Sequence, residues 1–330
     1  MKSYYTLAGK PGPSCYNTKS MKIVFMGTPE FAVPTFEMLA ASGWTLQAAF
    51  TTPDKPRDRL ETTPTPVGDL AERRGLPVYK FPSLKKDDRG LQVLRELVPD
   101  IIVVVAYGRL LPKAILDLPP LGCINLHPSL LPRYRGPSPI PAALLAGDET
   151  TGVTTMLLDE GMDTGPILLQ EKVSILPEDN AESLSERLAD LGASLMARTL
   201  RGLEAGTLRP KPQDDACATV SKLLDKEDGN ISWQEPARII HNKIRAFTPW
   251  PGSFTTLHGK RIKILEGRAF PEVQPEAPPG TILQVRARGI EVATGEGVFQ
   301  VTTVKLEGKN ACPVAVFICG HKIIPGEIWL

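Results

Sequence analysis

The chain has 330 residues, of which 42% are hydrophobic and 23% are charged, and its formal net charge is +1. These proportions are typical of a globular protein with room for two domains, and no apolar run reaches the ~18–20 residues of a membrane-spanning helix. The five cysteines are scattered without a C-x-x-C pair and there are four histidines, which disfavours a disulfide framework and a metal site. We therefore expect a cytoplasmic protein with reduced thiols, no bound metal and no membrane partner.

Residues 1–20 contain no apolar stretch of the kind found in a secretory signal, and we expect them to form a flexible extension. A strand pattern begins directly after Met21, which is therefore an alternative first residue of the natural protein. Residues 22–26 predict a buried strand, and residues 29–42 predict a helix that ends before Gly43. The turn between them reads GTPEFA, so it has neither the G-x-G-x-x-G fingerprint of a dinucleotide site nor a P-loop.

Strand and helix patterns then alternate as far as Gly206. Further strands are predicted at residues 46–51, 77–79, 100–106, 121–127, 152–157 and 167–175, and further helices at residues 67–74, 90–97, 137–147 and 181–206, the last capped by Asn180. A polar, proline-rich loop at 52–66 interrupts them, and loops of that length in a compact domain are usually functional or disordered. The alternation predicts an α/β domain with a Rossmann-like parallel sheet.

The rest of the chain has a different pattern. Residues 209–221 have the composition of a linker, and Ser232 and Glu235 have the spacing of a capping box before a helix at 237–247. Short strand-like runs follow at residues 260–265, 280–286, 289–293 and 298–305. Separated by small turns, they predict a small OB-like β-barrel. We therefore expect an α/β domain at 21–208 and a barrel domain at 222–330.

The two predicted domains differ in charge. Residues 21–208 carry a net charge of −5, whereas residues 222–330 carry a net charge of +3. The excess is small, but a positive domain beside a negative one favours a polyanionic partner for the second domain.

Two polar residues at the end of a predicted strand form the first part of a candidate site. In the run 121–127, Asn125 and His127 alternate with apolar residues, so both point to the same face of the strand. Pro128 cannot donate to a neighbouring strand and should end this one. In open α/β sheets, ligands bind at this carboxyl end of the strands. An isolated histidine is more often structural than catalytic, but this position favours a functional pair.

The acidic loop at 158–165, which contains three carboxylates and two glycines, supplies the second part of the site. Because we expect it to leave the same edge of the sheet, one of its carboxylates can approach His127. An amide, an imidazole and a carboxylate without a nucleophile suit acyl transfer to an amine, since the amine itself attacks. The amide and an imidazole N–H can donate to the oxyanion of the tetrahedral intermediate, and the carboxylate can hold the histidine tautomer or take the amine proton through water. A hydrolase would also need an activated nucleophile, and Ser129 is not surrounded by a G-x-S-x-G turn.

These motifs, in this order, resemble those of the 10-formyltetrahydrofolate-dependent formyltransferases. The resemblance rests on Asn125 and His127 followed by SLLPRYRG, and on DEGMDTG in the acidic loop. The runs MKIVFMGTPEFAVP, VVVAYGRLLP and RAFTPWPG are similar to the branch of the family that acts on methionyl initiator tRNA. The likeness extends from Met21 to nearly the last residue. It implies transfer of a formyl group from 10-formyltetrahydrofolate to the methionyl α-amino group, for translation initiation.

The resemblance also implies roles for individual residues. Asn125, His127 and Asp163 match the catalytic triad of the family, and Asp163 is preferred to the other loop carboxylates because it fills the D-x-G position. The SLLP segment, which matches the tetrahydrofolate-binding residues of the family, consists of Ser129, Leu130, Leu131 and Pro132. The backbone at 106–111 and the loop at 158–165 would hold the pterin ring.

The implied partners are a reduced folate and initiator tRNA, and we expect the tRNA to bind residues 222–330 of a monomer. The loop with which the family contacts tRNA is usually rich in glycine and lysine. Here it reads RDRLETT without glycine, and Arg59 best matches its functional arginine. Trp250 suits a core position at least as well as a contact with RNA.

Three alternatives stay open. A formyltransferase that acts on an amino sugar nucleotide can share the HxSLLPxYRG core and a similar second domain, although MGTPEFAVP and AYGRLLP argue against it. An NAD-dependent oxidoreductase is disfavoured because the glycine fingerprint is missing. An RNA-binding module with an inactive enzyme domain is disfavoured because Asn125, His127 and Asp163 are all present.

Overall fold

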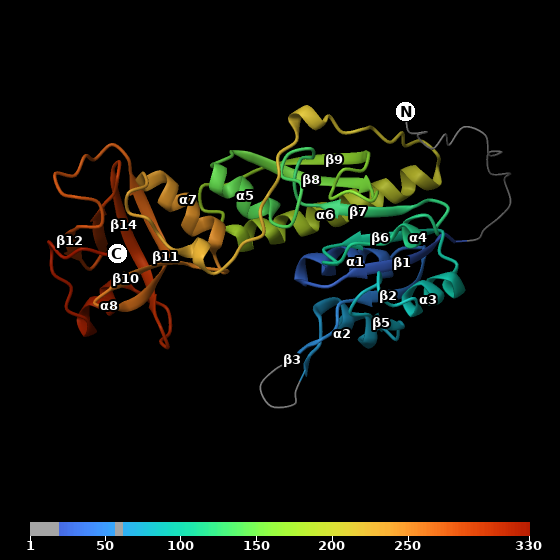
Figure 1. The fold of residues 1–330 in the computed structure, drawn as a ribbon, viewed down its shortest axis with the longest axis horizontal. Coiled ribbons are helices and arrows are strands. Elements are labelled where there is room, and N and C mark those ends of the chain that lie inside the picture. The colour runs from blue at the N-terminus through green and yellow to red at the C-terminus, as the bar shows by residue number, and fades with distance from the viewer. Residues whose placement is uncertain (1–19, 57–61) are drawn as a thin grey trace.

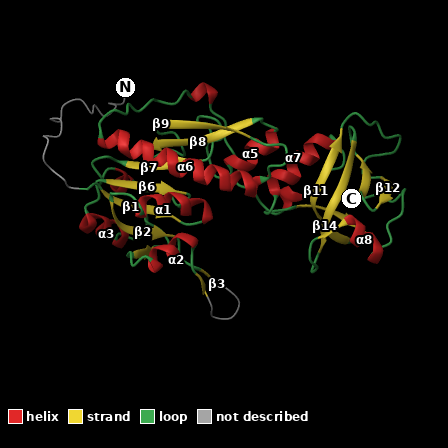
Figure 2. Cartoon of the chain, turned by 180° about the vertical axis from the view of Figure 1, so that it is seen from behind, coloured by secondary structure: helices red, strands yellow, loops and turns green. Residues whose placement is uncertain are grey.

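A computed structural model describes residues 20–56 and 62–330. The predicted extension lies almost entirely outside these residues, and so does Arg59. In Figures 1 and 2 the chain forms two bodies that meet along the helices α5 (Pro139–Ala146) and α7 (Ala237–Phe247). None of the helices in the described part of the chain is both long and apolar enough to cross a membrane.

The first body contains a seven-stranded sheet with the order β5-β2-β1-β6-β7-β8-β9. Its strands are β1 (Lys22–Gly27), β2 (Thr45–Thr51), β5 (Val78–Lys80), β6 (Ile101–Val105), β7 (Cys123–His127), β8 (Thr150–Leu157) and β9 (Ile167–Ser174). The first five in this order are parallel, whereas β8 runs antiparallel to β7 and β9 antiparallel to β8. The predicted Rossmann-like α/β class is confirmed, with a mixed sheet in place of a purely parallel one.

Helices cover both faces of this sheet because its central strands are apolar on both sides. In β6, Ile101, Val103 and Val105 pack into one core, and Ile102 and Val104 pack into the other. The first core includes residues of α1 (Val33–Ala40), α2 (Pro66–Arg73), α5 and α6 (Ala181–Glu204), and the second includes residues of α3 (Arg89–Leu97) and α4 (Lys113–Leu116). A continuous apolar run of this kind is typical of a central strand that is buried on both faces.

The start of α6 was also predicted correctly, and its cap is reciprocal. The side-chain oxygen of Asn180 accepts hydrogen bonds from the N–H groups of Glu182 and Ser183, each at 2.9 Å. The Ser183 hydroxyl accepts in turn from the Asn180 N–H at 3.1 Å. These bonds satisfy N–H groups that have no partner within the helix, and α6 then packs against α1 and β8.

Other local features differ from the predictions. The helix expected at 29–42 is divided into the 3-10 turn η1 (Glu30–Ala32) and α1, which ends at Ala40. The long polar loop contains a short hairpin made of β3 (Lys55–Pro56) and β4 (Thr62–Thr63). The helix α4 was not predicted, because four residues are too short to display a helical period.

The second body is an antiparallel sheet with the order β10-β11-β14-β13-β12, to which β15 adds beside β14. Its strands are β10 (Ser253–Leu257), β11 (Lys260–Phe270), β12 (Ile282–Arg286), β13 (Gly289–Ala293), β14 (Val298–Leu306) and β15 (Cys312–Pro313). The last residues of the chain join its two edges. Leu330 exchanges two backbone hydrogen bonds with Thr256 of β10, and the N–H of Ile282 in β12 donates to the carbonyl of Glu327. The sheet thereby closes, which confirms the barrel-like prediction.

Two predictions for this body were incomplete or wrong. The strand β10 and the helix α8 (Val314–Gly320) were not predicted. The capping box is absent, because α7 begins after Pro236 without a side-chain cap. Instead Glu235 closes a turn with Ser232 through a 3.1 Å backbone bond, and its carboxylate pairs with Lys243 at 3.1 Å.

Helix α7 fixes the two bodies relative to each other. Its Ile240 and Ile244 belong to the core of the barrel, whereas its Ala246 and Phe247 belong to the core of the first body. Arg245 of the same helix donates hydrogen bonds of 2.6 and 3.3 Å to the carbonyl oxygens of residues 179 and 176. One helix therefore contributes to both cores, so the bodies cannot separate without exposing apolar surface.

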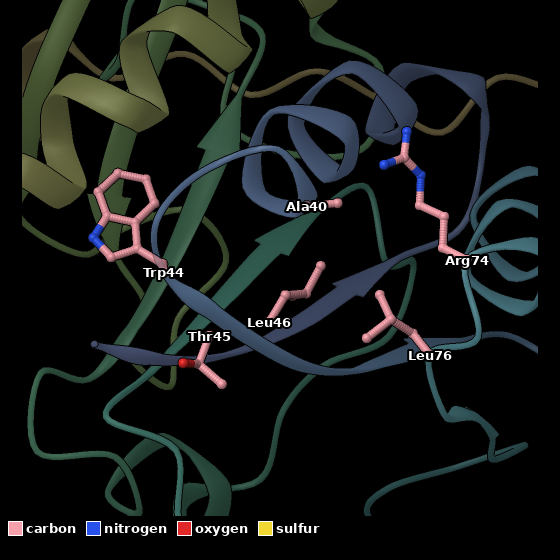
Figure 3. Close-up of a pocket in the computed structure, with 6 residues that line it drawn as sticks. All are labelled: Ala40, Trp44, Thr45, Leu46, Arg74 and Leu76. Atoms are coloured by element: carbon pink, nitrogen blue, oxygen red, sulfur yellow. The ribbon is translucent and has the colours of Figure 1, made fainter. Parts of the chain in front are cut away.

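A surface hollow of about 470 Å³ lies beside α1 and the start of β2 (Figure 3). Figure 3 shows Trp44 and Arg74 on opposite sides of it, with Arg74 3.5 Å from Glu37. The hollow opens where β2 begins, which is the amino edge of the parallel strands. The polar residues at the end of β7 lie at the opposite edge, so this hollow is separate from the candidate site.

Candidate active site

His127 is the last residue of β7 and its side chain is buried, with 4% of the residue exposed. Its Nε2 lies 2.9 Å from the carbonyl oxygen of Tyr134. Because a carbonyl can only accept a hydrogen bond, Nε2 carries a proton in both the neutral and the charged ring. The neutral ring therefore has its lone pair on Nδ1, and Nδ1 lies 3.6 Å from Oδ2 of Asp163.

Asp163 approaches His127 from the acidic loop in a backbone conformation that side chains rarely adopt. Its φ is +56°, in the left-handed region, and its Oδ2 accepts a 2.7 Å hydrogen bond from the N–H of Gly136. Within the loop, Asp159 accepts bonds from Gly161 and Thr164 at 3.0 and 2.7 Å. The loop is therefore held by its own bonds, and one backbone donor fixes the Asp163 carboxylate.

The route by which this loop reaches His127 corrects one expectation. Because β8 is antiparallel to β7, Leu157 at the end of β8 lies opposite Ile124, near the start of β7. The loop at 158–165 thus leaves the opposite edge of the sheet from the one at which β7 ends. It folds back toward His127, so the two segments meet although they do not leave the same edge.

Asn125 lies two residues before His127, on the same face of β7. The neighbours of Asn125 along the strand, Ile124 and Leu126, are buried in the first core, while Cys123, which shares the face of Asn125, belongs to the second. Asn125 is half-buried. Within the described part of the chain its amide makes no hydrogen bond, so both its donor and its acceptor are available to a ligand.

Burial has the largest effect on the pKa of His127. Removal from water disfavours the charged ring and lowers the pKa of His127 below its ordinary value, while the Asp163 carboxylate and the bond to Tyr134 act in the opposite direction. The net shift of the pKa is downward. Near neutral pH the imidazole is therefore neutral, and Nδ1 can accept a proton that Asp163 then stabilises.

This balance predicts the effect of removing the Asp163 charge. In Asp163→Asn, the group that favours the charged ring is lost while burial stays, so the pKa of His127 should fall further. The measurement is an NMR titration of the imidazole Cε1 proton in the wild type and the variant. Asp159→Asn, a change in the same loop, should leave the titration where it is. A His127 titration that is unchanged or moves upward in Asp163→Asn would contradict this electrostatic assignment.

The predicted folate segment is divided between internal and accessible residues. Ser129 is fully buried, and its hydroxyl donates to the carbonyl oxygen of residue 133 at 2.6 Å. Leu131 is buried as well, and its N–H donates to Thr154 Oγ1 at 3.2 Å. Leu130 and Pro132 are half-buried. The segment therefore supports the site from within, and its role in folate binding stays a prediction.

The segment after β6 has features that fit a planar, polar-edged ring such as a pterin. Ala106 and Gly108 have φ values of +45° and +76°, and Leu110 is 77% exposed. The N–H groups of Gly108 and Leu110 make no hydrogen bond to any described residue. Free backbone groups beside an exposed apolar side chain suit a ligand with an apolar face and a polar edge.

Two partners of the candidate residues were missed by the sequence-based prediction, because both are backbone atoms. The Tyr134 carbonyl and the Gly136 N–H belong to the motif SLLPRYRG, but no side-chain pattern marks them. Gly136 was the available signal: its φ is +106°, and a Cβ there would approach the carbonyl of Ser221 to 2.8 Å. In the described residues, no group of three His, Cys, Asp or Glu side chains has a metal-binding arrangement.

Comparison with known proteins places this site in a family. The formyl transferase model matches residues 21–200, and the model of the formyl transferase C-terminal domain matches residues 223–322. The chain belongs to the formyl transferase family. A curated methionyl-tRNA formyltransferase from Geotalea daltonii is 45% identical over 93% of this chain and 97% of its own length. One from Trichlorobacter lovleyi is 43% identical over 93% and 96%, so the resemblance drawn from the sequence motifs is confirmed.

Solved structures share the fold at lower identity. An N-formyltransferase from Helicobacter canadensis, in complex with folinic acid and dTDP-3-aminofucose, matches with a TM-score of 0.64 at 18% identity, covering 85% of this chain and 99% of its own. HypX from Aquifex aeolicus, in complex with tetrahydrofolic acid, matches with a TM-score of 0.60 at 17% identity, covering 90% of this chain and 47% of its own. These likenesses support the two-body fold.

Proposed function

We propose that this chain transfers a formyl group from 10-formyltetrahydrofolate to the α-amino group of methionine on initiator tRNA, for translation initiation. The observation that carries the proposal is the placement of Asp163 3.6 Å from the buried His127, beside the unengaged amide of Asn125. This arrangement occurs in a chain that is 43–45% identical over both bodies to curated methionyl-tRNA formyltransferases. We further propose a monomer that acts in the cytoplasm.

The chemistry assigns one task to each residue. The neutral methionyl amine attacks the formyl carbon, and a model α-amino group has a pKa of roughly 7.7–8.0. As the new C–N bond forms, the formyl oxygen becomes an oxyanion, to which the Asn125 amide can donate a hydrogen bond. His127 accepts the amine proton at Nδ1, directly or through water, and Asp163 stabilises the resulting imidazolium. The bond to the folate nitrogen then breaks, and that nitrogen receives the proton.

The His127 hydrogen bond modifies the role expected from the sequence. An imidazole N–H was expected to donate to the oxyanion, but the Nε2–H is already donated to Tyr134. Nδ1 is therefore the nitrogen open to reaction, and it faces a carboxylate. Nδ1 of the neutral ring and the Asp163 carboxylate are two acceptors 3.6 Å apart, an arrangement that favours binding of a proton between them. We therefore propose that His127 and Asp163 together accept the proton of the attacking amine.

The proposed donor site combines the segments around the polar cluster. The SLLP residues Leu130 and Pro132 are half-buried, and Met162 of the acidic loop is 50% exposed. After β6, the N–H groups of residues 108 and 110 make no hydrogen bond to a described residue. A solved neighbour of the same fold holds tetrahydrofolic acid. We propose that a reduced folate lies among these three segments, with its formyl group toward Asn125.

We propose that the barrel at 222–330 binds the tRNA. Its net charge of +3, against −5 for residues 21–208, suits the phosphate backbone, and α7 fixes it beside the catalytic body. Trp250 is 52% exposed, so it is accessible to RNA rather than a core residue. Arg59, the proposed loop contact, lies outside the described residues.

One assay separates this function from its nearest rival. With 10-formyltetrahydrofolate as donor, the purified protein should formylate methionyl initiator tRNA and leave a dTDP-linked amino sugar unchanged. The affinity for tRNA should also fall as the salt concentration rises. In a plot of the logarithm of affinity against the logarithm of salt concentration, the slope should be about −0.7 to −0.9 per phosphate contacted. Formylation of the amino sugar with no formylation of the tRNA would reverse the assignment. Binding of NADP without binding of reduced folate, measured by calorimetry, would exclude formyl transfer from a folate as the reaction of this protein.

A further inference from the structure

The segment between the two bodies, residues 209–221, is attached to the catalytic body along most of its length. In Figure 1 it is drawn in yellow to orange, and it passes along the side of the sheet formed by β8 and β9 before it turns toward α7. Lys211 exchanges two backbone hydrogen bonds of 2.8 Å with Ile167 at the start of β9. Further along, Arg135 forms a parallel bridge with Val220. Because the segment at 209–221 is hydrogen-bonded to the catalytic body near both of its ends, it is a structural part of that body.

Between these two attachments, Gln213 contacts the loop that carries Asp163. Its Nε2 donates to the carbonyl oxygens of Asp163 and Gly165, at 2.8 and 2.7 Å. Its Oε1 accepts a 3.0 Å bond from Nε of Arg135, whose residue is only 8% exposed. Every hydrogen-bonding atom of the Gln213 amide is therefore used, and two of its bonds end on the backbone of the acidic loop.

These bonds act on a strained part of the loop. Asp163 has a φ of +56°, a conformation that costs free energy for a residue other than glycine and persists where its surroundings hold it. The carbonyl groups of Asp163 and Gly165 both accept from the same Gln213 amide. These two bonds restrict rotation of the peptide groups between residues 163 and 165. Gln213 thereby stabilises the conformation that directs the Asp163 carboxylate toward His127.

The same segment also holds the second partner of His127. The hydroxyl of Thr219 accepts from the N–H of Tyr134 at 2.8 Å, and the carbonyl of Thr219 accepts from the N–H of Arg135 at 2.9 Å. Tyr134 is the residue whose carbonyl accepts from Nε2 of His127. One segment between the bodies therefore fixes the groups on both sides of the imidazole.

We propose that Gln213 is a positioning residue of the active site, and that through Gln213 and Thr219 the segment at 209–221 holds both partners of His127, the Tyr134 carbonyl and the Asp163 carboxylate, in place. The inference rests on the proposed function only for the kinetic readout. The segment expected to be a linker is then a working part of the catalytic body. Its loss or displacement lowers turnover without removing any group that touches a substrate.

The test uses Gln213→Ala and Gln213→Glu in the full-length protein. Gln213→Ala removes all the bonds. Gln213→Glu keeps the shape and the acceptor for Arg135, but places a carboxylate oxygen against two carbonyl oxygens. Both variants should lower kcat by about 10-fold to 10²-fold, the scale expected when a reacting group is slightly misplaced, with the KM values for folate and tRNA little changed. Lys211→Ala is the matched control, since that exposed side chain makes no hydrogen bond or ion pair with a described residue.

A double-mutant cycle separates positioning from general stability. If Gln213 acts through Asp163, then Gln213→Ala should have almost no further effect on kcat in the Asp163→Asn background, because coupled residues are not additive. If its effect is merely structural, the two losses should multiply. Equal fold-losses in both backgrounds, or a change confined to KM, would overturn the proposal.

A second readout does not depend on the reaction. Displacement of the Asp163 carboxylate should move the NMR titration of His127 to lower pH in Gln213→Ala, in the same direction as in Asp163→Asn. The wild type serves as reference, and a circular dichroism melt shows that the variant is folded. If the wild type fails to formylate tRNA, the proposed function fails while this titration still tests Gln213. An unchanged titration in a folded variant would overturn the positioning role.

Discussion

His127→Ala should lower kcat by about 10²–10⁴, the range typical of a lost general acid or base. The ring is buried, holds a proton on Nε2 through Tyr134, and presents Nδ1 to Asp163 at 3.6 Å. Without it, the proton of the attacking amine has no acceptor other than water or the carboxylate. The KM values should change little, because the imidazole contributes to transfer of the proton more than to binding of either substrate.

The measurement is a steady-state assay with charged initiator tRNA, run beside a circular dichroism spectrum of each protein. His258→Ala is the matched control: that histidine lies in the barrel, is mostly exposed and pairs with Glu327 at 3.2 Å. It should formylate at the rate of the wild type. Turnover by folded His127→Ala within a few fold of the wild type would exclude His127 from the chemistry.

The alternation of polar and apolar residues along the sequence predicts half of this site. Because side chains in a strand point to opposite faces in turn, Asn125 and His127 had to share a face, and the structure places them so. Pro128 predicted where the strand ends, and β7 ends at His127. These features depend on neighbouring residues alone, which is why the sequence was sufficient for them.

The approach of Asp163 could not be predicted in the same way. The run 152–157 has the same pattern in a parallel and in an antiparallel strand, and the direction of β8 decides at which edge the next loop begins. The positions of Gly136 and Gln213 against that loop are set by contacts between segments 27 and 50 residues apart. The family motif selected Asp163, which lies 3.6 Å from His127, although the geometric reason offered for its approach was wrong.

In the barrel, too, some features could be predicted from the sequence and others could not. Its strands β12, β13 and β14 follow periodic runs that were predicted nearly to the residue. Its closure depends on residues 327–330, which pair with both edges of the sheet and form no regular strand of their own. The false capping box at Ser232 and Glu235 arose because the N-cap residue of α7 is Pro236, whose side chain cannot accept a hydrogen bond, and the N–H of Ala237 donates instead to the Glu296 carbonyl at 2.9 Å.

Asn125→Ala should lower kcat by about 10²–10³, the cost of removing one donor from a developing oxyanion. Within the described residues the Asn125 amide makes no hydrogen bond, although it is half-buried on the face that it shares with His127. A buried polar group without a partner is costly, so an unengaged amide at a strand end is suited to a ligand. In the ground state the formyl oxygen is a weaker acceptor than the oxyanion, so KM should change little.

Asn125→Asp distinguishes donation from space filling. It has nearly the same volume but replaces the N–H donor with a carboxylate oxygen, so it should be at least as slow as Asn125→Ala, because its charge repels the oxyanion. Asn242 of α7, whose amide lies beside Gly147 at the end of α5, is a matched control; Asn242→Asp should retain turnover. If Asn125→Asp were faster than Asn125→Ala, the amide would matter for its shape, and the oxyanion would have to be stabilised by another group.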